Sequence, residues 1–206
     1  MSDSLPFSQS CENNRQPILK QLTGLLTEPA VVLEIGTGTG QHAEYFAGQL
    51  PHLRWLPTDH PDNVWTCRER LELADLPNVE APVALDVSDR PWQLPAFDHV
   101  YSANTAHIMA WEEVCDLFAG VAEGLNEGGC LCLYGPFNDQ GEFSSESNRQ
   151  FDRHLRARLA HMGLRDLEDL QTLAAEHGMS LYQNRPMPAN NRLLVFRKGP
   201  ADRCIL

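Results

Sequence analysis

The sequence has few basic side chains and no long apolar stretch. Its 206 residues include 16 Lys and Arg against 28 Asp and Glu, a formal net charge of −12. An acidic chain repels the phosphates of nucleic acids, so nucleic acid is an unfavoured partner. No apolar run approaches the length that spans a membrane, and no signal peptide is apparent. We therefore expect a cytoplasmic protein that has no membrane partner.

The cysteine spacing that is typical of metal and redox sites is also missing. The six cysteines form no C-x-x-C motif and stand at positions 11, 67, 115, 130, 132 and 204. Cys130 and Cys132 alternate along a predicted strand, which places both on one face and in the core. We predict free thiols in a reducing compartment and no metal site.

The composition that remains is that of a globular α/β protein. Apolar residues make up 42% of the chain and charged residues 21%. This length suits one domain over residues 1–206, in which residues 1–26 form an N-terminal helical cap. Residues 11–26 carry apolar side chains at helical spacing, and Pro17 predicts a helix start near that position.

A glycine-rich loop between a strand and a helix is the main motif. Residues 30–35 form a short apolar run typical of a buried parallel strand, and glycines follow at 36, 38 and 40. The next residues, 42–50, have helical spacing. Such a unit binds phosphates or nucleosides in doubly wound folds, because glycine permits positive φ and the helix start offers free N–H groups. The alternative is a glycine turn that binds nothing.

The spacing of the glycines decides which cofactor is expected. A dinucleotide fingerprint, G-x-G-x-x-G, would need glycine where the chain has Gln41. The observed E-x-G-x-G-x-G pattern resembles the first motif of class I S-adenosylmethionine (SAM) methyltransferases. The resemblance implies that the loop lies under the methionine part of SAM and that Glu34 faces its amino group. We assign to the cofactor site Glu34, Gly36, Thr37, Gly38, Gly40 and His42.

Two acids follow the next two predicted strands. Asp59 ends the strand 53–58, about twenty residues after the first glycine, where related folds place an acid against ribose hydroxyls. We predict a helix that opens at Pro61 and Asp62 and runs to about Ala74. The alternative role for Asp59 is to cap this helix. Asp86 ends the strand 79–85, in which Pro82 predicts an edge position. Asp86 resembles the methyltransferase acid that contacts the adenine amino group, and it could instead cap the loop at Ser88.

The fourth predicted strand, 97–102, leads into the segment S-A-N-T-A-H-I-M-A-W. Ligands bind beyond the carboxyl ends of such strands, so Ser102 joins the cofactor set and Asn104 and His107 are catalytic candidates. The D/N-P-P-Y signature of amino-group methylation is absent. His107 is a candidate general base, or it is a hydrogen-bonded histidine at a helix start.

The second half of the chain completes a seven-stranded sheet. We predict helices over 111–125 and 147–159, a third that begins at Asp166, and a polar lid over 137–147. Strands are expected at 130–134, 179–183 and 193–197, the last two as an antiparallel hairpin. The methyltransferase resemblance implies a Rossmann-like doubly wound sheet with strand order 3-2-1-4-5-7-6 and an antiparallel last strand.

A closer family resemblance covers nearly the whole chain. It is carried by C-E-N-N-R-Q-P-I-L (11–19), S-A-N-T-A-H-I (102–108), L-Y-G-P-F (133–137), S-S-E-S-N-R-Q-F-D (144–152), G-L-R-D-L-E-D-L (163–170) and M-P-A-N-N (187–191). These segments look like domain of unknown function 938 and are similar to animal methyltransferase-like protein 26. The resemblance implies a SAM-dependent methyltransferase and names no substrate. The segment 160–163 departs from the expected D-P-x-x-G-like stretch.

The polar family segments suggest where an acceptor binds. We assign Asn13, Arg15, Asn190 and Asn191 to a small-molecule pocket, although Asn also builds turns and caps. The prediction is therefore methyl transfer from SAM to an unidentified small molecule, with a homodimer left open. The alternatives are a protein that binds SAM without turnover and a nicotinamide-dependent oxidoreductase, which Gln41 disfavours.

Overall fold

The computed structural model describes residues 4–200, and Cys204 lies outside this range. The chain divides into two compact units, residues 1–89 and 90–206. The predicted single domain with a cap over residues 1–26 stays a prediction. Within the described range the other five cysteines are free thiols, and Cys130 and Cys132 are buried as predicted. No helix in residues 4–200 has the length and apolar character needed to cross a membrane.

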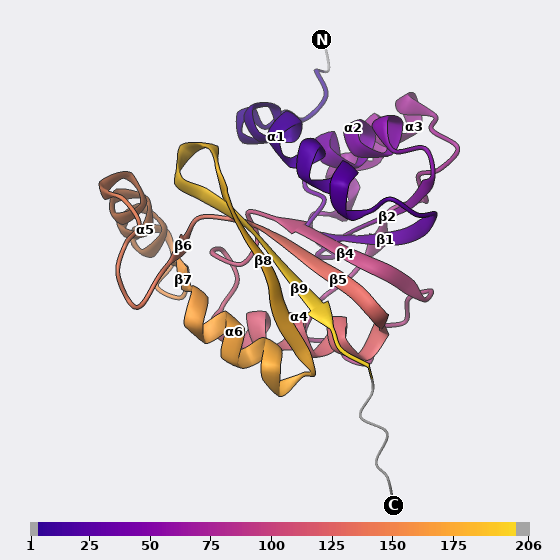
Figure 1. Ribbon diagram of the computed structural model, residues 1–206. Coiled ribbons are helices and arrows are strands. Elements are labelled where there is room, and N and C mark those ends of the chain that lie inside the picture. The colour runs from indigo at the N-terminus through magenta and orange to yellow at the C-terminus, as the bar shows by residue number, and fades with distance from the viewer. Residues whose placement is uncertain (1–3, 201–206) are drawn as a thin grey trace, which may run out of the picture. The chain divides into compact units, whose positions relative to one another are not determined.

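The first unit has three parallel strands, and helices α1, α2 and α3 lie on the same side of β1 and β2 (Figure 1). Its elements are α1 (Gln9–Leu25), β1 (Ala30–Ile35), α2 (Gln41–Gln49), β2 (Leu53–Asp59), η1 (Val64–Cys67), α3 (Arg68–Ala74) and β3 (Val83–Ala84).

The core of the first unit forms where β1, β2 and α2 meet. Val32 on β1 pairs in register with Trp55 on β2, and both side chains are fully buried. Phe46 of α2 packs on Trp55 with ring centroids 5.7 Å apart. Burying side chains of this size contributes about 1.5–3 kcal/mol each, so this packing holds β1, β2 and α2 together. The ends of β1 and β2 carry the glycine loop and Asp59.

The described part of the second unit contributes four strands to the large sheet and has a separate pair of short strands. Helices α4 and α6 lie next to each other on one side of the four strands (Figure 1). Its elements are β4 (Phe97–Ala103), α4 (Trp111–Gly124), β5 (Leu125–Gly135), β6 (Phe137–Asn138), α5 (Glu146–Arg158), β7 (Arg165–Asp166), α6 (Leu167–Glu176), β8 (Met179–Met187), η2 (Pro188–Asn190) and β9 (Asn191–Lys198).

The predicted strand order is confirmed. The sheet runs β3-β2-β1-β4-β5-β9-β8, in which β9 is the seventh strand of the sheet along the chain and is antiparallel to β5 and β8. As predicted, the strand after Pro82 lies at an edge, where the missing N–H of proline costs no ladder bond. That strand, β3, has only two residues, whereas the sequence predicted seven.

Three local predictions were wrong. Pro17 lies inside α1, not at a helix start; Asn13, whose carbonyl loses its intrahelical donor, is exposed, so water can serve it. The helix predicted from position 61 begins as η1, and α3 starts only at Arg68. The predicted lid over 137–147 begins with β6, which pairs in parallel with β7.

Candidate functional site

The glycine loop of the first unit has the backbone that its sequence predicts. Gly36, Gly38 and Gly40 have φ of 79°, 54° and 76°, values that residues with a side chain rarely adopt. The N–H groups of Gly36 and Thr37 both donate to the carbonyl of Thr58, each at 2.9 Å, which ties the loop to β2. A Cβ atom at Gly38 would have no heavy atom within 4 Å, so the loop is open on this side.

Glu34 lies under the loop and is 2% exposed. Its Oε2 accepts hydrogen bonds from the Thr37 hydroxyl at 2.8 Å and from the Trp55 indole N–H at 2.9 Å. Burial raises the pKa of Glu34 to about 7, although both hydrogen bonds act to lower it. Glu34 therefore shapes the loop from within, and it can exchange a proton near neutral pH.

Asp59 links the end of β2 to the glycine loop. Its Oδ2 accepts from the Gly38 N–H at 2.7 Å, and its Oδ1 accepts from the His60 N–H at 2.8 Å. Neither bond caps η1 or α3, which was the alternative role. Asp86 accepts from the Ser88 N–H at 3.0 Å, as its alternative role predicted, and its Oδ2 lies 3.7 Å from Nε2 of His60. Asp59 and Asp86 thus flank His60.

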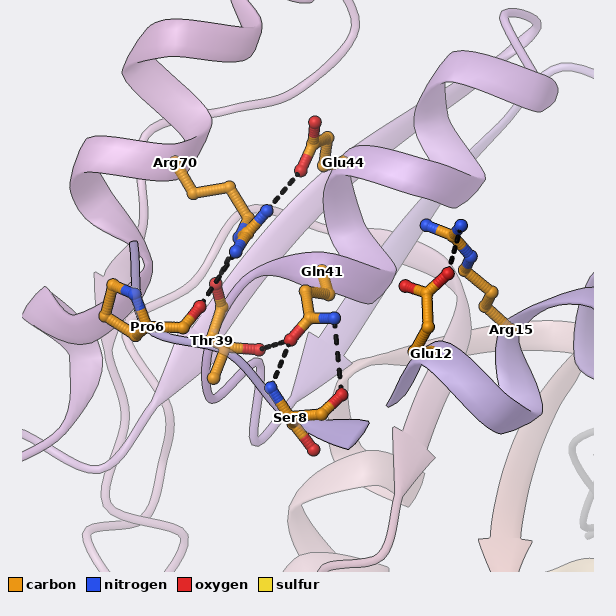
Figure 2. A network of polar contacts seen from close by, with 8 residues as sticks. All are labelled: Pro6, Ser8, Glu12, Arg15, Thr39, Gln41, Glu44 and Arg70. Carbon is orange, nitrogen blue, oxygen red and sulfur yellow. Dashed lines mark hydrogen bonds and ion pairs between the residues drawn. The ribbon is translucent and has the colours of Figure 1, made fainter. Parts of the chain in front are cut away.

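A clamp on the N-terminal segment is a feature that sequence reasoning missed (Figure 2). Oε1 of the buried Gln41 accepts from the Ser8 N–H at 2.6 Å and from the Thr39 hydroxyl at 2.9 Å, and its Nε2 donates to the Ser8 carbonyl at 3.3 Å. Arg70 donates to the carbonyls of Thr39 and Pro6. The only sequence signal was Gln41 itself, a polar residue where a dinucleotide fingerprint has glycine.

His42 at the start of α2 is held by α1. Its Nε2 lies 2.7 Å from Oδ1 of the buried Asn14, and its ring stacks on Phe46 with centroids 5.0 Å apart. Burial lowers the pKa of His42 to about 4, so the imidazole is neutral. The predicted cofactor role of His42 stays a prediction; its visible contacts join two helices.

In the second unit, the segment after β4 carries the catalytic candidates. The hydroxyls of Ser102 and Thr105 share a 2.6 Å hydrogen bond. Asn104 has a φ of 59°, and its N–H donates to the carbonyl of Tyr134 on β5. His107 is 7% exposed, and its ring meets Phe151 edge to face with centroids 5.2 Å apart. Strained backbone at a non-glycine residue is typical of functional sites.

Two backbone anchors hold the segment that contains His107. Arg165 donates from Nε to the carbonyl of Ala106 at 2.9 Å and from Nη2 to the carbonyl of Met109. The Gly163 N–H donates to the carbonyl of His107 at 2.9 Å. Burial, followed by the Arg165 charge, lowers the pKa of His107 to about 4. His107 therefore has a neutral imidazole on a backbone that hydrogen bonds anchor.

The residues predicted to line an acceptor pocket have partners of their own. Asn13 is exposed and accepts from Gln9, while Arg15 pairs with Glu12 and lies 4.6 Å from the Tyr45 ring centroid. The Asn190 side chain donates to Ser147 and that of Asn191 to the carbonyl of Pro188. Asn191 thus serves the hairpin turn, which was its alternative role, whereas Asn190 joins that turn to α5.

Within residues 4–200 no group of three or more His, Cys, Asp and Glu side chains is placed to hold a metal ion.

Comparison with known proteins identifies one family and one fold. The family described as "Protein of unknown function (DUF938)" matches residues 5–198. The SAM-dependent methyltransferase SibL superposes with a TM-score of 0.77 and 20% identity, over 92% of this chain and 56% of that one. An O-methyltransferase family protein from Burkholderia thailandensis has a TM-score of 0.80, 17% identity and coverages of 93% and 58%.

Human N-acetylserotonin methyltransferase in complex with SAM is similar to the same degree. Its TM-score is 0.78 at 19% identity, over 93% of this chain and 53% of that one. The present chain thus spans a little over half the length of these proteins. At these identities the likeness shows a shared methyltransferase fold.

Proposed function

Since the chain belongs to the DUF938 family of proteins of unknown function, we propose from its site that it is a SAM-dependent methyltransferase acting on a small molecule. One observation carries the proposal: Asp59 at the end of β2 holds the Gly38 N–H of the E-x-G-x-G-x-G loop at 2.7 Å. This joins a predicted ribose acid to the predicted methionine loop, within a sheet that has the strand order of methyltransferases.

The residues present fit this cofactor. Each carboxylate oxygen of Asp59 accepts one backbone hydrogen bond, which leaves lone pairs for two ribose hydroxyls. Gly38 leaves open space beside the loop, and Glu34 lies beneath it. The other residues proposed to hold SAM are Gly36, Thr37, Gly40, His42, Asp86 and Ser102. SAM, when bound, supplies a methyl group on a positively charged sulfur.

His107 and Asn104 are proposed to act on the acceptor. A neutral imidazole can take a proton from the acceptor group, and the amide of Asn104 can orient that group by hydrogen bonding. Positioning of reactants alone can supply roughly 7–11 kcal/mol toward a displacement of this kind. Asn13, Arg15, Asn190 and Asn191 remain proposed contacts of a larger acceptor.

A nicotinamide cofactor is the less favoured ligand for a specific reason. Gln41 stands where the dinucleotide fingerprint requires glycine, and its side chain is engaged with Ser8 and Thr39. A dinucleotide pyrophosphate approaches the main chain at that point, and a glutamine side chain engaged with the N-terminal segment obstructs it.

Titration calorimetry with SAM, its demethylated product and NAD tests the cofactor. We expect the first two to bind and NAD not to bind. Asp59→Ala should weaken the binding of SAM by about 2–4 kcal/mol, because charge-assisted hydrogen bonds to ribose are lost. Asp62→Ala, which removes an exposed acid three residues away, is the matched control and should bind normally. Tight binding of NAD without binding of SAM would refute the proposal.

A further inference from the structure

His107 is a buried polar side chain without a hydrogen bond. Although it is 7% exposed, no residue in the range 4–200 hydrogen-bonds its imidazole, and none bonds the side-chain amide of Asn104. Buried polar side chains nearly always have such partners, so each exception calls for an explanation. Among these residues, Asn138 Oδ1 is the only fully inaccessible side-chain N or O atom without a partner. The unpaired atoms of His107 and Asn104 therefore reach accessible space.

Gly135, the last residue of β5, lies where these atoms converge. A Cβ atom placed on Gly135 would be 3.8 Å from Nδ1 of His107, 3.9 Å from Oδ1 of Asn104 and 3.7 Å from Cζ of Phe137. These are ordinary contact distances, so the missing side chain leaves space for one methyl-sized group. We name the space bounded by Asn104, His107, Gly135 and Phe137 the Gly135 recess.

The groups around the Gly135 recess are polar yet carry no net charge. The amide of Asn104 is neutral, and the imidazole of His107 is neutral because burial lowers its pKa to about 4. Two cations lie nearby, and both have partners: Arg165 donates to backbone carbonyls, including those of Ala106 and His161, and Arg192, which pairs with Gly135 across the sheet, forms an ion pair with Asp139 at 3.1 Å. A carboxylate or phosphate would lose its hydration here without gaining a free counter-charge. A hydroxyl can donate to Oδ1 or Nδ1.

Aromatic rings complete the surroundings. Phe137 borders the Gly135 recess, and the edge-on Phe151 packs against the imidazole of His107. An apolar body attached to the hydroxyl would meet these rings with little loss of hydration. The two features together describe a phenol or an alcohol on an apolar ring.

We propose that the Gly135 recess binds the hydroxyl of an uncharged acceptor and that Gly135 determines specificity by keeping the recess open. The assignment rests on the proposed methyl transfer. In that step the acceptor oxygen forms a bond to the methyl carbon while the methyl–sulfur bond breaks. The electron pair of the broken bond stays on sulfur. The hydroxyl proton passes to Nδ1 of His107 and then to solvent.

Phenol is the probe, and the histidine side-chain NMR signals of the full chain, without SAM, are the readout. Phenol should shift the signal of His107, identified by its loss in His107→Gln, whereas benzoate and anisole should not. Gly135→Ala fills the recess and should weaken phenol binding at least about tenfold. Its melting temperature should stay equal or rise, because Gly135 lacks positive φ and alanine lowers unfolded-state entropy.

Two further variants keep the test decisive. Gly24→Ala in α1, where a Cβ would meet nothing within 4 Å, is the matched glycine control and should leave phenol binding unchanged. Asn104→Gly removes Oδ1, and glycine adopts the left-handed backbone of this position. This variant should weaken the binding of phenol, and it tests the recess even if Gly135→Ala fails to fold.

No phenol shift, stronger binding of benzoate than of phenol, or wild-type phenol binding by Gly135→Ala would overturn the recess assignment. The calorimetry with SAM is independent of this experiment. A protein that binds phenol at His107 but does not bind SAM would refute the proposed function and leave the recess in place. Binding of SAM without binding of phenol would do the reverse.

Discussion

His42 in the first unit and His107 in the second are buried to nearly the same degree but differ in their partners. They are 4% and 7% exposed, and burial lowers the pKa of each to about 4. Each ring also packs against a phenylalanine. Only His42 has a side-chain hydrogen-bond partner, the Asn14 amide at 2.7 Å.

The difference separates a structural histidine from a candidate site. A buried imidazole with a partner joins α1 to α2 and stabilises the fold. A buried imidazole whose nitrogens are unpaired yet accessible costs free energy, unless a ligand supplies the missing hydrogen bond. Burial and pKa alone could not distinguish the two, because both values agree. The hydrogen-bond partner distinguishes them.

The largest expected effect is on turnover. His107→Leu should lower methyl transfer at least about 100-fold, because a proton acceptor in the transition state is lost. SAM affinity should stay within about tenfold of the wild type, since His107 addresses the acceptor. Labelled SAM with a metabolite extract measures the first quantity and calorimetry the second. His154→Leu, an exposed histidine of α5, is the control. Unchanged turnover in His107→Leu would remove His107 from the reaction.

The second effect is on stability, and here the substitution of His42 should have a larger effect than that of His107. His42→Leu should lower the free energy of unfolding by up to about 3 kcal/mol, because the buried Asn14 amide loses its partner. His107→Leu should be neutral or stabilising, because it removes an unpaired polar group at similar volume. Urea denaturation at pH 8 measures both variants. A greater loss in His107→Leu than in His42→Leu would show that His107 is the structural residue.

The two histidines should contribute equally to the pH dependence of the free energy of unfolding. In the fold the pKa of each histidine is lowered from 6.5 to about 4, so the unfolded chain binds more protons between these pH values. The fold therefore loses stability as the pH falls from above 6.5 toward 4. Between pH 8 and pH 5 the loss is about 2 kcal/mol for each residue. Glu34 acts in the opposite sense, because burial raises its pKa from 4.5 to about 7.

The difference between wild type and each His→Leu variant isolates the histidine from Glu34. Urea denaturation from pH 5 to pH 8 should show that the wild type loses about 2 kcal/mol more than His42→Leu on acidification, and likewise more than His107→Leu. A variant that keeps the full wild-type pH dependence would mean that its histidine is already protonated in the fold at pH 5.

The smallest effect concerns the two asparagines. Asn104→Gly should raise the free energy of unfolding by about 0.5–1 kcal/mol, because glycine adopts its φ of 59° without steric cost. Asn14→Ala should instead lower stability by about 1 kcal/mol or more, because Nε2 of the buried His42 loses its partner Oδ1 of Asn14. Thermal unfolding of both variants beside the wild type measures these changes in stability. A clear loss in Asn104→Gly would indicate a structural hydrogen bond for the Asn104 side chain.

Much of the fold could be read from patterns of apolar residues and glycine. The run Ala30–Ile35 and its glycines predicted β1, the loop and α2, because a buried parallel strand and positive φ each leave a local signature. The start of α6 at Asp166 was likewise predicted, and the Asp166 carboxylate accepts from the Glu168 N–H. Such features depend on neighbours in sequence.

The wrong predictions share a physical origin in contacts between distant residues. The β6–β7 pair joins Phe137 to Arg165, residues that no local pattern connects. Pro17 is accommodated in α1 because the buried residues Ile18 and Leu22 hold the helix against the core. Residues 12–15 are four polar residues in a row, of which we assigned Asn13 and Arg15 to the acceptor pocket. Helix geometry turned Asn14 inward and Asn13 outward.

Residue patterns were enough to predict the main strands, the glycine loop and the residues that follow each strand, because periodicity and glycine act locally, while the strand order came from the family resemblance. What those residues do depends on the fold. Folding supplied the hydrogen bonds from Gln41 to Ser8 and the partner of His42, and among residues 4–200 it supplied no hydrogen-bond partner for the imidazole of His107. Hydrogen bonding between residues far apart in the chain depends on where side chains meet, and no residue type or spacing records that.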